Sequence, residues 1–565
     1  MRFKINFILV VFILSMVSLS AANYTDFSQF QKHINQEAKR VINKDLHAAI
    51  RAERDVRDYN VGDVRDFWRF DFTEMPPSWE QAPATCRAVG EHCYIFVSDE
   101  EWNVNMNQQD IDTVFEYLEN STMNGDDFGA IEMDINLFGE IPDELDNDEK
   151  IIVYYSALGS YNGSVFDGYF SSYNQVTEAE AATMNPPGHS NECEMIYMTC
   201  SPLDPTNPTR ISVLSHELQH MIHWGHDNNE YTWVDEGMAE LAMVHFGMPD
   251  PITSFNGNAN YSLNFWDQQW KDYVKVMLFF TYLDEQITSE NFIADVVNEQ
   301  LNGIDGIANQ LIEHGYQMPF EEIFANWTIA NYLDEEDIYD GIYNYESLEL
   351  PNFNYNSLIN SFPDTESESV EPWATRYVKI HHDQPITVNI TVDNQMNLAL
   401  LKTGPEVETI VEKIIIDESG MIEIPIYESP YNCHTLVLTN ANDALLNYNL
   451  EVNEVLGSDE NDLDLNNVIK IENYPNPFKL SSNDRSSGTN IKFYTTDDSK
   501  STEITIYNMK GQKVKTVLNE KLSVGVHNVL WNGTDEIGQK VSAGLYLSKI
   551  QVGNDMKIRK MMIIK

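Results

Sequence analysis

The sequence predicts several domains: a mixed α+β domain, followed by two separate units built from β-strands. The chain has 565 residues, more than one ordinary domain holds. Residues 85–345 mix β-branched and aromatic runs with helical patterns, whereas residues 366–455 and 471–565 carry short strand patterns separated by turn residues. The last range also differs in charge, since it holds 14 Lys and Arg against 9 Asp and Glu, while residues 1–470 hold 21 against 80.

The first 22 residues have the layout of a secretory signal peptide. Arg2 and Lys4 precede an apolar run from Phe7 to Leu14, and small residues up to Ala22 follow. The run is short for a membrane span, which needs about 20 apolar residues; a retained anchor is the alternative. Residues 23–84 then read as an N-terminal arm or propeptide, with a polar helix expected at 27–55. We therefore expect an exported protein whose mature chain has no transmembrane segment.

The net charge excludes some classes of partner, and the cysteine spacing bears on whether the cysteines bind a metal. The formal net charge of −54 repels nucleic acid and anionic membranes, so neither is expected as a partner. Two cysteine pairs are close in sequence, Cys86 with Cys93 and Cys193 with Cys200, while Cys433 stands alone. Disulfides or free thiols are favoured here over a metal site, because these spacings are wider than a Cys-x-x-Cys pair.

The chemistry of the α+β domain centres on a predicted helix with two histidines. Asn207 can cap this helix, Pro208 suits its first position, and apolar residues recur after it with helical spacing. His216 and His220 share one helical face, so both can bind one metal ion. Glu217 then projects beside the open coordination position, where it can take a proton from a water molecule.

A second predicted helix supplies the third metal ligand. It carries the sequence from Trp233 to Ala242 and stops at Gly247. Glu236 and Glu240 share one face of this helix. We expect Glu236 to bind zinc and Glu240 to accept a hydrogen bond from a ligand histidine.

The two helices together resemble the gluzincin metallopeptidases, and among these the hyicolysin type. The matching segments are His-Glu-Leu-Gln-His-Met-Ile from His216 and Trp-x-x-Glu-Gly-x-x-Glu from Trp233. The resemblance covers about residues 190–285. It implies a zincin-like α+β metalloprotease domain over residues 85–345, with Zn2+ as the cofactor.

Other residues offer alternatives or additions to this site. His226 follows His216 by ten residues, where a metzincin places its third histidine, but His223 stands where a metzincin needs glycine, so Glu236 is preferred. The resemblance also implies a Tyr or His that stabilises the oxyanion, and Tyr273 is the candidate, with core packing as the favoured alternative. The acidic residues 143–148 are dense enough for Ca2+, yet they lack EF-hand spacing, so a solvated turn is favoured.

The two C-terminal units have different predicted roles. Residues 366–455 are expected to form a β-sandwich accessory domain, and residues 456–470 a linker. Residues 471–565 resemble a C-terminal sorting domain of the type IX secretion system. The resemblance is carried by Asn473-Tyr474-Pro475-Asn476-Pro477-Phe478, Ile506-Tyr507-Asn508-Met509-Lys510-Gly511-Gln512, Ala543-Gly544-Leu545-Tyr546 and the Lys560–Lys565 end. It implies an immunoglobulin-like β-sandwich, the type IX secretion machinery as a partner, and a secreted or outer-surface location.

These patterns favour a secreted zinc metalloendopeptidase that hydrolyses extracellular proteins or peptides. His216, His220 and Glu236 would hold the metal, and Glu217 would act as general base. Two alternatives stay open: a secreted adhesin or polymer-binding protein with an inactive zincin domain, and a zinc hydrolase of a non-protein substrate.

Overall fold

The structure, a computed structural model, describes most of residues 27–564. The residues outside this description are 1–26, 55–57, 144, 162–163, 383–384, 405–406, 417–420, 427–430, 432, 455–470, 475–477, 480–487, 496–500, 509, 511, 523–524, 553–554 and 565. The signal peptide expected at 1–22 and the linker expected at 456–470 therefore lie outside the described residues. The chain divides into two compact units, Met1–Glu454 and Val455–Lys565.

The first unit contains a six-stranded mixed sheet in the order β1-β2-β3-β4-β8-β7. The strands are β1 (Val64–Asp71), β2 (Ser78–Val89), β3 (Cys93–Ser98), β4 (Ile151–Ser156), β7 (Gly168–Phe170) and β8 (Met195–Thr199). β3, β4 and β8 run parallel and are buried throughout, which explains their nearly continuous apolar sequences. β7 is an edge strand and pairs antiparallel with β8.

This sheet corrects the expected start of the domain at residue 85. β1 and the first half of β2 precede that residue and pair in register, from Val64 with Thr85 to Asp71 with Ser78. The β1 sequence alternates only weakly between apolar and polar residues, so its place in the sheet depends on pairing with β2.

Two helices stand where one N-terminal helix was expected. These are α1 (Phe27–Val41) and α2 (Lys44–Glu53). The side chain of Asn43 caps α2 by accepting a hydrogen bond from the backbone N–H of Leu46, at 3.1 Å, so the chain turns between the helices.

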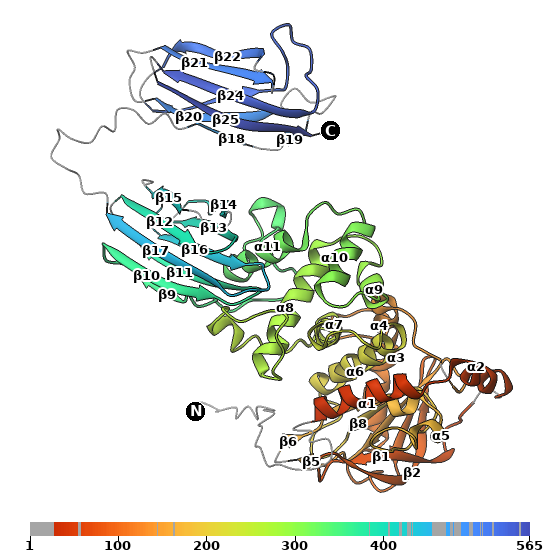
Figure 1. The fold of residues 1–565 in the computed structure, drawn as a ribbon. Coiled ribbons are helices and arrows are strands. Elements are labelled where there is room, and N and C mark those ends of the chain that lie inside the picture. The colour runs from red at the N-terminus through yellow and green to blue at the C-terminus, as the bar shows by residue number, and fades with distance from the viewer. Residues whose placement is uncertain are drawn as a thin grey trace. The chain divides into compact units, whose positions relative to one another are not determined.

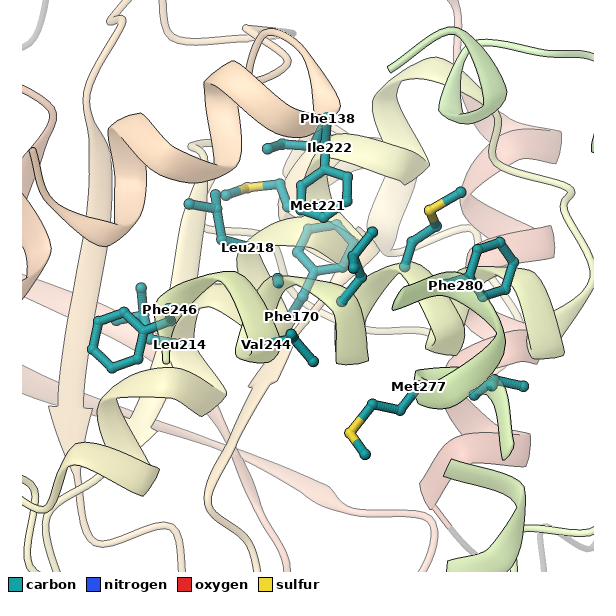
Figure 2. Packing of buried hydrophobic residues seen from close by; sticks show 14 of the residues in the cluster. Phe138, Phe170, Leu214, Leu218, Met221, Ile222, Val244, Phe246, Met277 and Phe280 are labelled. Atoms are coloured by element: carbon teal, nitrogen blue, oxygen red, sulfur yellow. The ribbon is translucent and has the colours of Figure 1, made fainter. Parts of the chain in front are cut away.

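Three helices form the centre of the first unit: α6 (Pro208–His226), α7 (Thr232–Phe246) and α8 (Trp270–Gln286). α7 contacts both of the others. Figure 2 shows their buried side chains, among them Leu218 and Met221 of α6, Val244 of α7 and Phe280 of α8. Phe138 of α4 (Ala130–Phe138) and Phe170 of β7 lie in the same cluster (Figure 2).

Two further sheets lie in the region of the first unit where the accessory β-sandwich was expected (Figure 1). Their orders are β10-β17-β12-β15 and β14-β13-β16-β11-β9. The second sheet shares a core with the helices: the hydroxyl of Tyr377 donates a hydrogen bond to the carbonyl oxygen of Thr328 at 2.6 Å, and Val437 belongs to the same apolar cluster as α8. Residues 27–454 are thus one compact unit rather than two separate ones.

The remaining elements of this unit have the following bounds. They are α3 (Gln108–Glu119), β5 (Ser160–Tyr161), β6 (Ser164–Val165), α5 (Glu178–Ala181), α9 (Phe292–Val297), α10 (Ile304–Glu313), α11 (Phe320–Leu333), β9 (Ser357–Ile359), β10 (Asp364–Val370), β11 (Ala374–His381), β12 (Ile386–Val392), β13 (Met396–Thr403), β14 (Ile410–Ile416), β15 (Met421–Ile426), β16 (Cys433–Asn440) and β17 (Leu446–Glu454), with short 3-10 helices at Ser172–Gln175, Phe255–Gly257 and Tyr339–Gly341.

The second unit is built from strands alone in its described part. Its sheets have the orders β18-β20-β23 and β19-β25-β24-β21-β22. The strands are β18 (Ile471–Tyr474), β19 (Phe478–Lys479), β20 (Thr489–Thr495), β21 (Ser501–Asn508), β22 (Lys513–Lys521), β23 (Gly525–Trp531), β24 (Gly544–Val552) and β25 (Asp555–Ile564). Trp531 is fully buried in its core with Ile504 and Ile506.

The cysteines form no disulfide in the structure, so the thiol alternative holds. Cys86 and Cys93 lie on neighbouring strands but not opposite each other, because Cys86 pairs with Phe96. Burial raises the pKa of Cys86 to about 11 and that of Cys200 to about 12, which keeps both as thiols at neutral pH. Among the described residues, no helix combines the length and the apolar character that crossing a bilayer requires.

Candidate metal centre

Helix α6 begins and runs as the sequence predicts. The Asn207 side chain accepts a hydrogen bond from the backbone N–H of Thr209 at 3.0 Å, and Pro208 occupies the first turn. The helix buries Leu214 and Leu218 completely. His216 and His220 therefore lie one turn apart on a rigid, well-packed helix.

The structure brings His216, His220 and Glu236 together. The Nε2 atoms of the two histidines are 3.2 Å apart, and Glu236 Oε2 lies 3.5 Å from that of His216 and 3.7 Å from that of His220. Ligands at 2.0–2.2 Å from a tetrahedral zinc ion are separated by about 3.3–3.6 Å. The three atoms thus have the spacing of three corners of a zinc tetrahedron, and their side chains are only 11–13% exposed.

Carboxylates lie behind the histidine rings, on the side away from the metal position. Glu240 Oε1 lies 3.5 Å from Nδ1 of His216. Asp235 Oδ1 lies 3.1 Å from Nδ1 of His220 and 3.1 Å from Nδ1 of His223. With each Nδ1 facing a carboxylate, the Nε2 atoms of His216 and His220 are left to face the metal position.

Asp235 and His223 were not foreseen in this role. Asp235 directly precedes Glu236, and in a helix neighbouring residues point in directions about 100° apart, so the sequence gives no reason to place both on the same metal site. Only the crossing of α6 and α7 brings Asp235 against two histidines of the other helix. In the sequence, only the position of Asp235 next to the predicted ligand Glu236 pointed to a role at the metal centre.

The centre holds an excess of negative charge. Burial opposes protonation of both histidines, yet Glu236 and Glu240 raise the pKa of His216 well above its ordinary value. In the same way, Asp235 raises the pKa of His220 to about 9. These carboxylates favour the positively charged form of the histidines. A divalent cation bound at the same place would neutralise the carboxylates instead.

Glu217 lies next to the centre and contacts the edge of the sheet. Its Oε2 accepts a hydrogen bond from the backbone N–H of Phe170 at 2.8 Å. Phe170 is the last residue of β7, so the proposed general base lies beside the sheet edge.

Tyr273, the candidate for oxyanion stabilisation, lies in the first turn of α8. Burial, followed by the carboxylates of Glu236 and Glu240, raises the pKa of Tyr273 well above its ordinary value. Its ring packs edge-on against Trp266, with centroids 5.0 Å apart. The residue is partly buried, so it contributes to packing, and it stays protonated at neutral pH; its role at the oxyanion stays a prediction.

The alternative ligand His226 lies elsewhere. It is the last residue of α6, and its Nε2 lies 3.0 Å from the carbonyl oxygen of Glu140. Glu236, and not His226, shares the group of potential metal ligands with His216 and His220.

Two aspartates of the acidic stretch, Asp146 and Asp148, are buried, which differs from the solvated turn that was favoured; residue 144 lies outside the described residues. Asp146 and Asp148 are only 3% and 6% exposed. Asn147 adopts a left-handed backbone conformation with φ 59°, and its N–H donates to Asp143 Oδ1 at 3.0 Å. This turn brings Asp143 and Asp146 within 4.8 Å of Glu194, just before β8; calcium at this cluster stays a prediction.

A cavity of about 210 Å³ opens onto the metal ligands. His220 and Glu236 line it, together with residues of α1 and of the segment from Asp227 to Thr232. We refer to it as the metal cavity.

Comparisons with known proteins support part of this description. The family described as peptidase of plants and bacteria (BSP) matches residues 200–316, a stretch that contains α6, α7 and α8. The FlgD Ig-like domain family matches residues 479–555 in the second unit, which is therefore an immunoglobulin-like β domain. No curated protein matches the chain.

Similar solved structures cover only parts of the chain. One is PorZ, a surface component of the type-IX secretion system of Porphyromonas gingivalis, at 16% identity and a TM-score of 0.14, covering 23% of this chain and 15% of PorZ. Another is the pre-peptidase C-terminal domain of a collagenase from Bacillus anthracis, at 13% identity and a TM-score of 0.15, covering 18% of this chain and 99% of that domain.

Proposed function

We propose that this chain is a secreted zinc-dependent endopeptidase of the gluzincin type, similar to the hyicolysin metallopeptidases. The observation that carries the proposal is the convergence of His216, His220 and Glu236 at the spacing of a zinc tetrahedron. The match of residues 200–316 to a peptidase family gives further support.

The side chains around the centre have separate tasks in peptide hydrolysis. His216, His220 and Glu236 would hold Zn2+, which supplies Lewis-acid polarisation of the scissile carbonyl and of a water molecule. Glu217 takes the proton of the attacking water and transfers it to the leaving amine. Tyr273, protonated at neutral pH, donates a hydrogen bond to the oxyanion.

Glu217 is suited to this task by its position. Its Oε2 contacts the Phe170 N–H at the edge of the sheet, at 2.8 Å, and an extended peptide can add to such an edge. A peptide bound along β7 would pass directly by the base. This arrangement favours cleavage within a chain over removal of a terminal residue.

The proposal includes export by type IX secretion. The signal-peptide pattern, the sorting-domain motifs and the immunoglobulin-like second unit support a secreted or surface-attached protein. The type IX machinery would be its partner in export.

Casein cleavage by the full-length protein tests the function. Glu217→Gln keeps an oxygen for the Phe170 N–H but removes the base, so we expect bound zinc to be retained and activity to fall by about 1000-fold. Glu290→Gln, an exposed glutamate between α8 and α9, is the matched control and should behave as wild type. Zinc-loaded wild-type protein that leaves casein intact would contradict the proposal and favour the adhesin or a non-protein substrate.

A further inference from the structure

Helix α1 forms one wall of the metal cavity. Five of its side chains line the cavity: Gln31, Lys32, Asn35, Gln36 and Lys39. They recur with helical spacing and make up one polar face of the helix. The metal ligands His220 and Glu236 line the same cavity, so α1 borders the space in front of these two ligands.

The opposite face of α1 anchors it to the core. Phe27, Phe30, Ile34 and Ala38 are at most 6% exposed and belong to the main apolar cluster. The Phe27 ring packs edge-on against that of Phe72, with centroids 5.0 Å apart. The place of α1 is therefore determined by core packing, not by its polar contacts alone.

The polar face of α1 bridges the two sides of the cavity. Gln31 Nε2 donates to the carbonyl oxygen of Phe170 in β7 at 2.9 Å. On the other side, Lys39 Nζ donates to Asn229 Oδ1 at 2.7 Å and Lys32 Nζ to Thr232 Oγ1 at 3.3 Å. These contacts span from the sheet edge to the start of α7.

The contact with Phe170 occupies the place where a peptide would bind. β7 is an edge strand, so a peptide that extends the sheet would pair with its outward backbone groups. At Phe170 the N–H already donates to Glu217 and the carbonyl oxygen already accepts from Gln31. While α1 is docked, a peptide N–H cannot reach the carbonyl oxygen of Phe170; the contact of the Phe170 N–H with Glu217 does not involve α1.

We propose that the cleft between β7 and the 227–232 segment is the peptide-binding surface, and that α1 is its intramolecular occupant. The inference rests on the proposed function. Substrate and α1 compete for the same surface, so the docked form is latent. Displacement of α1 opens the cleft without changing the metal ligands.

The test loosens α1 while leaving its apolar face intact. Gln31→Ala, Lys32→Ala and Lys39→Ala are combined in the full-length protein, and Lys44→Ala on α2, outside the cavity, is the matched control. Circular dichroism verifies folding, and hydrogen exchange of the α1 amides verifies loosening. Each lost hydrogen bond shifts the docking equilibrium by about 5-fold, so the triple variant shifts it by roughly 100-fold.

Two measurements compare the triple variant with the wild-type protein: KM for a peptide substrate and the rate of zinc release. With a short peptide substrate, a competing occupant raises the apparent KM and leaves kcat unchanged, so the triple variant should lower KM by at least about 10-fold. Independently of catalysis, a chromophoric chelator should remove zinc from the triple variant several-fold faster than from wild type, because α1 no longer covers the cavity.

The outcomes separate this inference from the proposed function. Faster α1 exchange with unchanged KM and unchanged zinc release overturns the inference. Zinc-loaded protein that cuts neither the peptide nor casein overturns the proposed function, and the zinc-release rates then still decide whether α1 covers the metal. A protein that binds no zinc overturns both.

Discussion

Asp235 offers a sharp test of the metal centre, because it was found only in the tertiary structure. We predict that Asp235→Ala weakens zinc binding although Asp235 itself is no ligand. The substitution removes the carboxylate that lies 3.1 Å from Nδ1 of both His220 and His223. The His220 ring then loses the contact that directs its Nε2 toward the metal.

The expected magnitude follows from that geometry. Hydrogen bonds to a charged group contribute about 1.5–3 kcal/mol, and every 1.4 kcal/mol changes an equilibrium constant about tenfold. Only the contact with His220 acts directly on the metal, and the Asp235 side chain is 33% exposed, so water replaces part of the interaction. We therefore expect zinc affinity to fall by about 10- to 100-fold.

The assay is competition for zinc against a chromophoric chelator at pH 7.5, with the full-length protein. Asp284→Ala is the matched control, because Asp284 Oδ2 contacts His245 Nε2 at 2.8 Å at the far end of α7. Glu240→Gln should weaken zinc binding as Asp235→Ala does, through His216. Wild-type zinc affinity in Asp235→Ala would refute the claim that this carboxylate orients a ligand.

Three further predictions concern catalysis, pH and packing. Tyr273→Phe should lower kcat on a peptide substrate by about 10- to 100-fold with little change in KM, since only the oxyanion contact is lost; an unchanged kcat would leave packing as its role. Burial raises the pKa of Glu230 from 4.5 to about 7, so folding favours the protonated carboxyl group. The free energy of unfolding should therefore fall by about 2 kcal/mol as pH rises from 4.5 to 7. Urea unfolding of Glu230→Gln should lack that part of the slope, and an identical slope would contradict the prediction. Gly237→Ala should destabilise the protein by about 1–3 kcal/mol in urea unfolding, because the added Cβ would lie 2.2 Å from the buried Phe280 ring. Gly257→Ala is the control: its added Cβ meets no atom within 4 Å, so the free energy of unfolding should not change.

The sequence by itself determined the local parts of the centre. Helix α6 could be predicted from the Asn207 cap, Pro208 and the apolar spacing, because all three act within a few residues. The end of α7 at Gly247, which has φ 92°, followed from the same local rules. His216, His220 and Glu236 could be chosen because helical spacing and ligand chemistry are both visible in the sequence.

The tertiary structure alone decided how these parts meet. Asp235 contacts two histidines only because α6 and α7 cross at that point, and Asp143 and Asp146 meet Glu194, about fifty positions away in sequence, only in the folded chain. The N-terminal arm showed no catalytic content in sequence, yet five side chains of α1 line the metal cavity. Such contacts join residues up to about two hundred positions apart, as Lys32 and Thr232 are. They depend on the packing of whole helices and sheets, and no short-range pattern in the sequence encodes that packing.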